Sequence, residues 1–139
     1  MVHEFASEDA SKFHDSEISS IEIVRSDNEM RISLLMPSGI HARLEIKKIR
    51  FARIVDFVMQ NVVSEIRVST FVNFSGDELK ELVNWSNSFS DVEIELTPDS
   101  MRKCLKDISN GSLQVLAIKP SRGAGAVIVA ERIFVRWCE

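Results

Sequence analysis

The chain has 139 residues, of which 45% are hydrophobic and 27% are charged. This length suits one domain, because two separate cores would each approach the size at which folding becomes marginal. The composition excludes wholesale disorder, a collagen-like repeat and a disulfide-rich scaffold. No apolar run approaches the ~20 residues that cross a bilayer, and the acidic, polar first segment is unlike a secretory signal. We therefore expect a cytoplasmic protein that does not enter a membrane.

Charge is unevenly distributed along the chain, whose net charge is −4. The acidic groups concentrate in residues 1–30 and 71–111, whereas residues 31–70 carry seven basic and three acidic side chains. An acidic domain is a poor nucleic-acid binder, since phosphate contacts dominate that affinity and require a positive face. It is a reasonable partner for a basic protein.

The first half of the sequence predicts a meander of strands. We expect residues 1–17 to form an acidic lead-in that is at most partly ordered, followed by a single domain over residues 18–139. Strict alternation of apolar and polar residues predicts two strands over 30–36 and 40–46, joined by Pro37-Ser38-Gly39 as a hairpin. Further features are a strand at 21–24, a turn at 26–28, a turn or bulge at Lys47-Lys48, a loop over 57–61 and a strand over 65–72.

The second half predicts two helices and three strands. Ser75 and Glu78 have the spacing of a capping box, and Thr97-Pro98 places an N-cap before a proline at the first helical position. Alternation over Val92, Ile94 and Leu96 predicts a strand between these helices. Two long apolar strands, 113–118 and 126–137, finish the chain and are expected at the centre of the sheet. The expected fold class is α+β, with a mostly antiparallel sheet of about seven strands and two helices.

The sequence offers few candidate catalytic groups. His14 and Asp15 could form a ligand pocket at the sheet edge, although Asp15 or Ser16 capping a turn is the more economical interpretation. Cys104 falls on the apolar stripe of the second helix, where burial would make it inert, and Cys138 is penultimate. We expect no metal site, no cofactor and no catalysis.

Three surface patterns remain. The Gly-Ala-Gly segment between Pro120 and Gly125 precedes a strand rather than a helix, so it is read as a hairpin turn. A basic stripe formed by Arg43, Lys47, Lys48, Arg50 and Arg53 is read as a solvated sheet face. The third pattern is an acidic docking surface for a basic partner, which requires surface charge but no exact geometry. Its residues would be Asp15, Glu17, Asp77, Glu78 and Glu81.

Three short segments occur in an order that resembles a known group of proteins. They are Phe13-His14-Asp15-Ser16-Glu17-Ile18, Gln60-Asn61-Val62-Val63 and Ile118-Lys119-Pro120-Ser121-Arg122-Gly123-Ala124. The group consists of small bacterial domains with a hydrophobic-His-Asp-Ser opening, some of which resemble immunity proteins of polymorphic toxin systems. This chain has Arg122 where an aromatic residue would be expected. The resemblance implies an antiparallel sheet with two helices and a protein that binds and neutralises another protein, without catalytic residues.

The leading functional expectation is therefore a non-enzymatic protein-binding domain, such as an immunity protein that occludes a basic toxin. One alternative is a small-molecule-binding protein or enzyme that uses His14 and Asp15. Another is a structural homo-oligomer in which the apolar C-terminal strands pair across a symmetry axis. The sequence leaves open whether the protein is a monomer or a homodimer.

Overall fold

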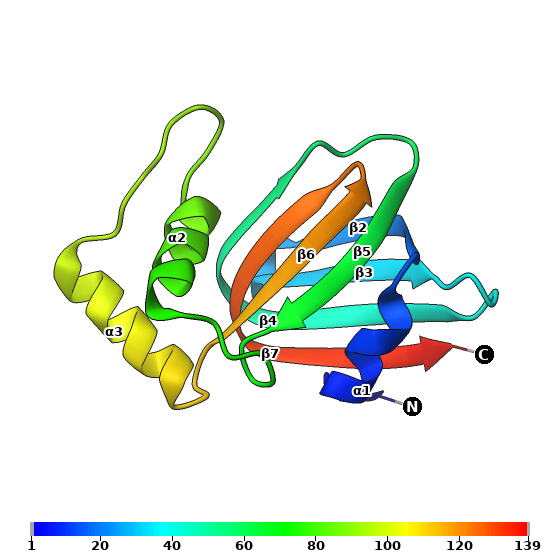
Figure 1. The fold of residues 1–139 in the computed structure, drawn as a ribbon, viewed down its shortest axis with the longest axis horizontal. Coiled ribbons are helices and arrows are strands. Elements are labelled where there is room, and N and C mark those ends of the chain that lie inside the picture. Colours follow the sequence, from blue (N-terminus) through cyan, green and yellow to red (C-terminus); the bar gives the residue numbers. More distant parts are fainter. Residues whose placement is uncertain (1, 139) are drawn as a thin grey trace.

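The computed structural model describes residues 2–138 and confirms the α+β class, with one domain built on a single antiparallel sheet (Figure 1). Met1 and Glu139, the outer ends of the predicted ranges 1–17 and 18–139, lie outside the described residues. The strands are β1 (Val2–Glu4), β2 (Glu17–Val24), β3 (Glu29–Leu35), β4 (His41–Val55), β5 (Asn61–Val68), β6 (Gln114–Arg122) and β7 (Gly125–Cys138). The α-helices are α1 (Ser7–Ala10), α2 (Gly76–Asn87) and α3 (Pro98–Ser109), and 3₁₀ turns occur at η1 (Ser11–Phe13) and η2 (Arg25–Asp27).

The sheet curves until it closes into a ring. Its strand order is β1-β7-β4-β3-β2-β5-β6, and β6 pairs in addition with β7. The closing ladder joins Gln114 to Ala130 and Ile118 to Ala126. β6 pairs with β5 and β7, and β7 pairs with β4, β6 and β1, so much of both apolar C-terminal strands has a neighbour on each edge.

The predicted hairpin of β3 and β4 is confirmed. Leu34 lies opposite Ala42 and Ile32 opposite Leu44, and these alternate positions are all buried. Lys47 and Lys48 lie within β4 and not in a turn. Lys48 has a φ of 55°, and the ladder with β7 has a bulge just beyond it, where the register shifts between Ile49 and Phe51. A bulge increases bending and twist, so β4 continues as one strand around the ring.

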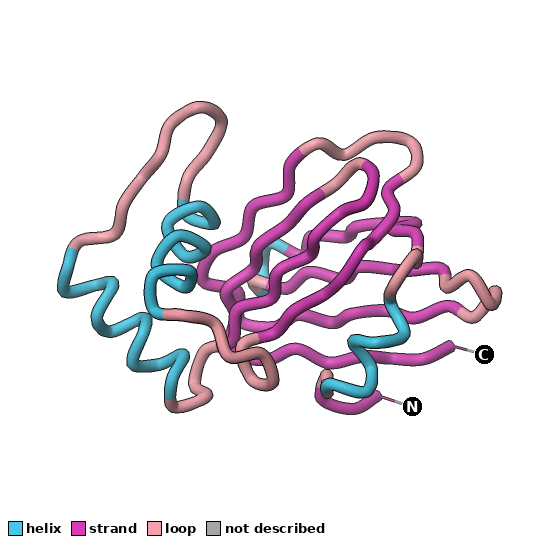
Figure 2. The backbone as a smooth tube through the Cα atoms, in the orientation of Figure 1, coloured by secondary structure: helices cyan, strands magenta, loops and turns pink. Residues whose placement is uncertain are grey.

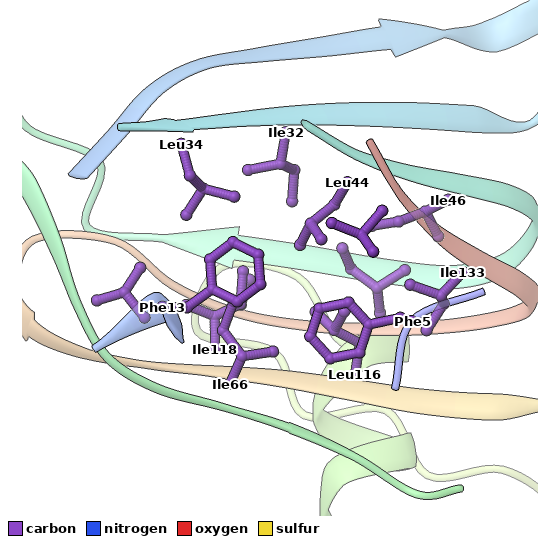
Figure 3. Close-up of a cluster of buried hydrophobic side chains, with 14 of the residues drawn as sticks. Phe5, Phe13, Ile32, Leu34, Leu44, Ile46, Ile66, Leu116, Ile118 and Ile133 are labelled. Carbon is purple, nitrogen blue, oxygen red and sulfur yellow. The ribbon is translucent and has the colours of Figure 1, made fainter. Parts of the chain in front are cut away.

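The interior of the ring is filled by apolar side chains from every strand except β1 (Figure 3). Phe5 and Phe13 enter this core from the N-terminal segment, and the Phe13 ring stacks on Trp137 with centroids 5.3 Å apart. β1 pairs with β7. The boundary predicted at residue 18 is therefore corrected, because residues 2–17 belong to the domain and supply part of its core.

A second core lies between the outer face of the sheet and the two long helices, which lie together on one side (Figure 2). Met101, Cys104 and Ile108 of α3 and Val83 of α2 pack with residues of β6 and β7. Strands β6 and β7 are thus buried on both faces, which explains their nearly continuous apolar sequences. No helix among residues 2–138 is long and apolar enough to cross a membrane.

Both predicted helix starts are confirmed. The Ser75 hydroxyl accepts a hydrogen bond from the Glu78 amide, and Thr97 Oγ1 accepts one from the Ser100 amide. The Glu78 carboxylate bonds Arg67 of β5 at 3.3 Å, so only half of the predicted capping box forms. Helix α3 ends before Asn110 and Gly111. Gly111 has a φ of 84°, a left-handed conformation that favours glycine.

The strand predicted over Val92, Ile94 and Leu96 is wrong, because this segment is a loop between α2 and α3. Its backbone donors are satisfied by the end of α2: the Ile94 amide donates to Ser88 Oγ at 2.8 Å and the Leu96 amide to Asn84 Oδ1 at 2.9 Å. Side-chain acceptors of this kind compete with ladder formation. Alternation in the sequence did not reveal that competition.

Candidate functional site

The His14–Asp15 pair lies at the surface and holds the backbone in place. His14 Nδ1 lies 2.8 Å from the carbonyl oxygen of Ser64 in β5, and His14 Nε2 lies 3.5 Å from Asp15 Oδ2. Asp15 has a φ of 62°. Both side chains are more than half exposed, and the main surface hollows are lined by other residues.

The residues around this pair are structural. Phe13 is fully buried, and the buried Ser16 hydroxyl donates to the Phe13 carbonyl at 2.6 Å, which closes the turn that enters β2. The Asp15 amide and the Ser16 carbonyl both bond Val63. The hydrophobic-His-Asp-Ser opening therefore anchors the start of β2 to β5.

The other two segments of the resemblance meet in space. Asn61, which is 1% exposed, accepts hydrogen bonds on Oδ1 from the amides of Val58 and Ala124, both at 3.0 Å. Its Nδ2 donates to the Val58 carbonyl at 2.6 Å. One buried amide thus joins the β4–β5 loop to the β6–β7 turn, and Gly123 in that turn has a φ of 81°. The predicted hairpin turn is confirmed.

The predicted acidic surface is divided. Glu78 is bound to Arg67, and Glu17 is half-buried opposite Val62. Asp77 and Glu81 are exposed on α2, which Figure 1 shows well separated from the segment that contains Asp15. Of the five predicted residues, only Glu81 lines one of the hollows described next.

Two hollows lie side by side along α2 and share Glu81 and Trp85. The first, of about 470 Å³, is bounded by the end of β4, α2 and the β6–β7 hairpin. The second, of about 410 Å³, is bounded by α2 and the α2–α3 loop. Arg53 of β4 stacks over the Trp85 ring at 4.5 Å and donates to the Ser90 carbonyl at 2.8 Å, which fixes that loop against the sheet.

The loops that contribute to the walls of the two hollows also carry large apolar side chains that are exposed to solvent. Met59 at the tip of the β4–β5 loop is fully exposed and Phe57 is 54% exposed, next to Val55 and Asp56 in the wall of the first hollow. In the α2–α3 loop Phe89 is 61% exposed, beside Val92 in the wall of the second. We call this region the α2 face; it comprises Asp56, Phe57, Val58, Met59, Glu81, Trp85, Phe89, Asp91, Val92 and Glu93.

The free charge of the α2 face is mainly negative. Its four carboxylates are exposed and make no ion pair among residues 2–138. Of the two basic residues in the wall of the first hollow, Arg67 is paired with Glu65 and Glu78, while Lys119 makes no ion pair with any of residues 2–138. Arg53 is engaged by Trp85 and the loop carbonyls. An apolar surface rimmed by acidic groups suits a partner with basic and apolar side chains.

The basic stripe is largely neutralised, in agreement with its interpretation as a solvated face. Arg43 and Arg136 share Glu45, at 3.3 and 2.9 Å, and Lys47 lies 3.9 Å from Glu29. Burial alone would raise the pKa of Glu45, but the hydrogen bonds and charges of the two arginines outweigh it and lower that pKa. Few of these cations remain free for a phosphate backbone.

Cys104 does not have the setting of a nucleophile. Cys104 is buried as predicted, and burial raises the pKa of its thiol with help from the charge of Asp107. A raised pKa keeps the thiol protonated and unreactive. Cys138 is exposed. Within the described chain no three His, Cys, Asp or Glu side chains gather as metal ligands.

The domain contains one buried carboxylate that the sequence does not predict. Asp9 is 2% exposed and accepts hydrogen bonds from the Ala6 amide at 2.9 Å and from Trp137 Nε1 at 3.1 Å. His3 Nε2 lies 3.0 Å from Asp9 Oδ2. Burial alone would raise the pKa of Asp9, but these bonds and the charge of His3 lower it. In the sequence Asp9 is one of several acidic residues in the segment 1–17, and no pattern marks it as buried.

Comparisons with known proteins do not indicate a function for this chain. No protein-family model matches the chain, and neither the curated proteins nor the solved structures contain a match to it.

Proposed function

We propose that this chain is a non-enzymatic protein-binding domain and that the α2 face is its docking surface. One observation carries the proposal: the two loops that supply Asp56 and Val92 to the walls of the acid-rimmed double hollow also present Phe57, Met59 and Phe89 to solvent. A large apolar side chain that stays exposed loses about 1.5–3 kcal/mol of the stabilising free energy that its burial would contribute. Contiguous exposed apolar surface with a polar rim is typical of protein interaction sites.

The shape of the face supports a protein partner. Its loops are held in place by Asn61 and Arg53, so the apolar side chains are presented without a large ordering cost on binding. Trp85 lies between the hollows, and tryptophan is enriched among residues that dominate binding energy. The unpaired carboxylates would attract a basic surface.

A more specific form of the proposal is a toxin-neutralising immunity protein that acts by occlusion. The domain would cover a basic surface of a toxin and block its access to substrate by steric exclusion. This form is supported by the resemblance in the three short segments and by the acid-rimmed α2 face.

Site-specific photo-crosslinking in the source cell tests the docking surface. A benzophenone side chain would replace Met59 or Phe89, and a matched control would replace Lys106, which is exposed on α3. We expect both test positions to label the same protein and the control to leave it unlabelled. Equal labelling from Lys106, or no protein shared by Met59 and Phe89, would contradict the proposal.

Binding to the purified partner provides the quantitative test. Phe89→Ser should weaken the Kd by about tenfold or more, corresponding to about 1.4 kcal/mol. Glu81→Lys should weaken it most at low salt, because screening reduces the attraction of surface charges. For the immunity form, co-expression should protect cells from the cognate toxin, and Phe89→Ser should remove that protection.

A further inference from the structure

The wall of the ring has a gap where two strands each have an unpaired edge. β2 pairs with β3 along its length but with β5 only at Glu17 and Ile18, so the second edge of residues 19–24 is open. β4 pairs with β3 only as far as Ile46, and residues 47–55 pair with β7 alone. Within residues 2–138 no strand covers either edge.

A hollow of about 430 Å³ lies in this gap. Most of its wall is apolar: Ile23, Val24, Met30, Ile49, Ala52 and Ile54. Ile23 lies opposite Met30 in the ladder and therefore faces the same side of the sheet, yet Ile23 is 61% exposed while Met30 is 4% exposed. Residues on the inner face of β2 thus border interior space that the chain itself does not fill.

The unpaired charge in the wall of this hollow is positive. Arg25 lines the hollow and makes no ion pair with any described residue, and Arg50, which is half-exposed, lies 3.8 Å from Glu131. Glu29, the one carboxylate in the wall, is engaged by Arg31 and Lys47. A carboxylate brought to this edge would meet the unpaired guanidinium group of Arg25, and Arg50 lines the same hollow.

We propose that residues 19–24 form a β-addition site for an extended segment of a partner protein. The segment would pair its backbone with the open edge of β2 over about 20 Å. Alternate apolar side chains would enter the hollow, and an acidic side chain would contact Arg25 or Arg50. Unpaired strand edges bind other strands in this way, because only a backbone repeats its donors and acceptors at the required spacing. This site is distinct from the α2 face and does not depend on it.

A second copy of this chain fits the edge poorly. An antiparallel pair centred on Glu22 would set two glutamates directly opposite each other, which is destabilising. A pair centred between Ile21 and Glu22 would place an apolar residue of one copy opposite a charge of the other. A pair centred on Ile21 would bring Val24 against Ile18, whose edge is already occupied by Asn61.

Selection from a display library of random twelve-residue peptides tests the site directly. The variants are Ile23→Lys and Arg25→Glu, and the matched control is Ile40→Lys, at an exposed isoleucine in the β3–β4 turn. We expect selected peptides to alternate apolar and polar residues and to include Asp or Glu. Their affinity should fall about tenfold or more with Ile23→Lys, because an edge lysine opposes strand pairing. Arg25→Glu should also weaken them, and Ile40→Lys should not.

Backbone hydrogen exchange distinguishes strand addition from side-chain contact alone. A bound peptide should slow exchange of amides within residues 19–24. Protection confined to the α2 face, or a library that yields no Ile23-dependent peptide, would overturn the proposal. A doubling of the 15.7 kDa mass that Ile23→Lys abolishes would assign the edge to a second copy and would overturn it as well.

Discussion

At the scale of single residues, a few buried polar groups determine how distant segments of this chain meet. Asp9 joins the first strand to the last through His3 and Trp137, and Asn61 joins two loops through three hydrogen bonds. Buried polar atoms cost free energy unless they are bonded. Removing such a group leaves its partners unsatisfied, which costs more than the net gain from an average hydrogen bond.

The pKa of Asp9 leads to a pH-dependent prediction. Because the folded-state pKa lies below the ordinary value of 3.8, the ionised carboxylate stabilises the fold above that value. The contribution is lost as pH falls through the folded-state pKa. Asp9→Asn should lower the free energy of unfolding by about 1–3 kcal/mol at pH 7, and the difference from wild type should shrink below about pH 4.

Urea denaturation between pH 7 and pH 2 checks this prediction. Asp27→Asn is the control, since Asp27 is exposed and accepts only a 3.4 Å hydrogen bond from Ser26. The control should change stability little at any pH. A loss for Asp9→Asn that is constant over the whole range would contradict the assignment of the pKa shift.

At the scale of elements, the contact between the β4–β5 loop and the β6–β7 turn leaves no room for a side chain at Gly123. A Cβ there would lie 2.4 Å from Asn61 Oδ1 and 2.8 Å from Val58 Cγ2. Gly39 also has a positive φ, of 90°, but no atom lies within 4 Å of the corresponding Cβ position. The two glycines therefore separate the cost of backbone conformation from the cost of crowding.

Gly123→Ala should lower the free energy of unfolding by about 1–3 kcal/mol more than Gly39→Ala does. Both variants bear the cost of a side chain at positive φ, and only Gly123→Ala must also displace Asn61 and Val58. Chemical denaturation of the two variants measures the difference. Equal losses would show that the loop and the turn are not closely packed at this point.

Elements with clean local signals could be predicted from sequence. The β3–β4 hairpin, both helix starts and the glycine at the end of α3 each depend on neighbouring residues. Closure of the ring could not be predicted, because β7 must pair not only with its hairpin neighbour β6 but also with the distant β4, after the bulge in β4 has turned the sheet. The α2 face was missed for a similar reason. Phe57 and Phe89 are 32 positions apart in the sequence, and no periodicity relates them.

At the scale of the whole molecule, the N-terminal segment closes one side of the inner core. Phe13 is fully buried and stacks on Trp137, while Phe5 stacks on Phe71 with ring centroids 5.7 Å apart. Phe13→Ala should therefore lower the free energy of unfolding by about 3–5 kcal/mol. Phe57→Ala, at an exposed position on the α2 face, should change it by about 0.5 kcal/mol or less.

Thermal or urea unfolding of the two variants tests whether residues 2–17 belong to the cooperative domain. A similar small loss for both would mean that the segment contributes little to its stability. The same measurement serves as a control for binding experiments. If the Phe57 variant retains full stability, a loss of binding cannot be attributed to unfolding.

The position of β7 in the ring has a consequence for how the protein is made. β7 contacts β1, β4 and β6, contributes to both cores, and follows every other strand in the chain. On the ribosome, the nascent chain therefore presents β4 and β6 without their common neighbour until the last strand has left the exit tunnel. During that interval the growing polypeptide exposes apolar strand surface on both sides, so we expect chaperone contact to end only after β7 has emerged.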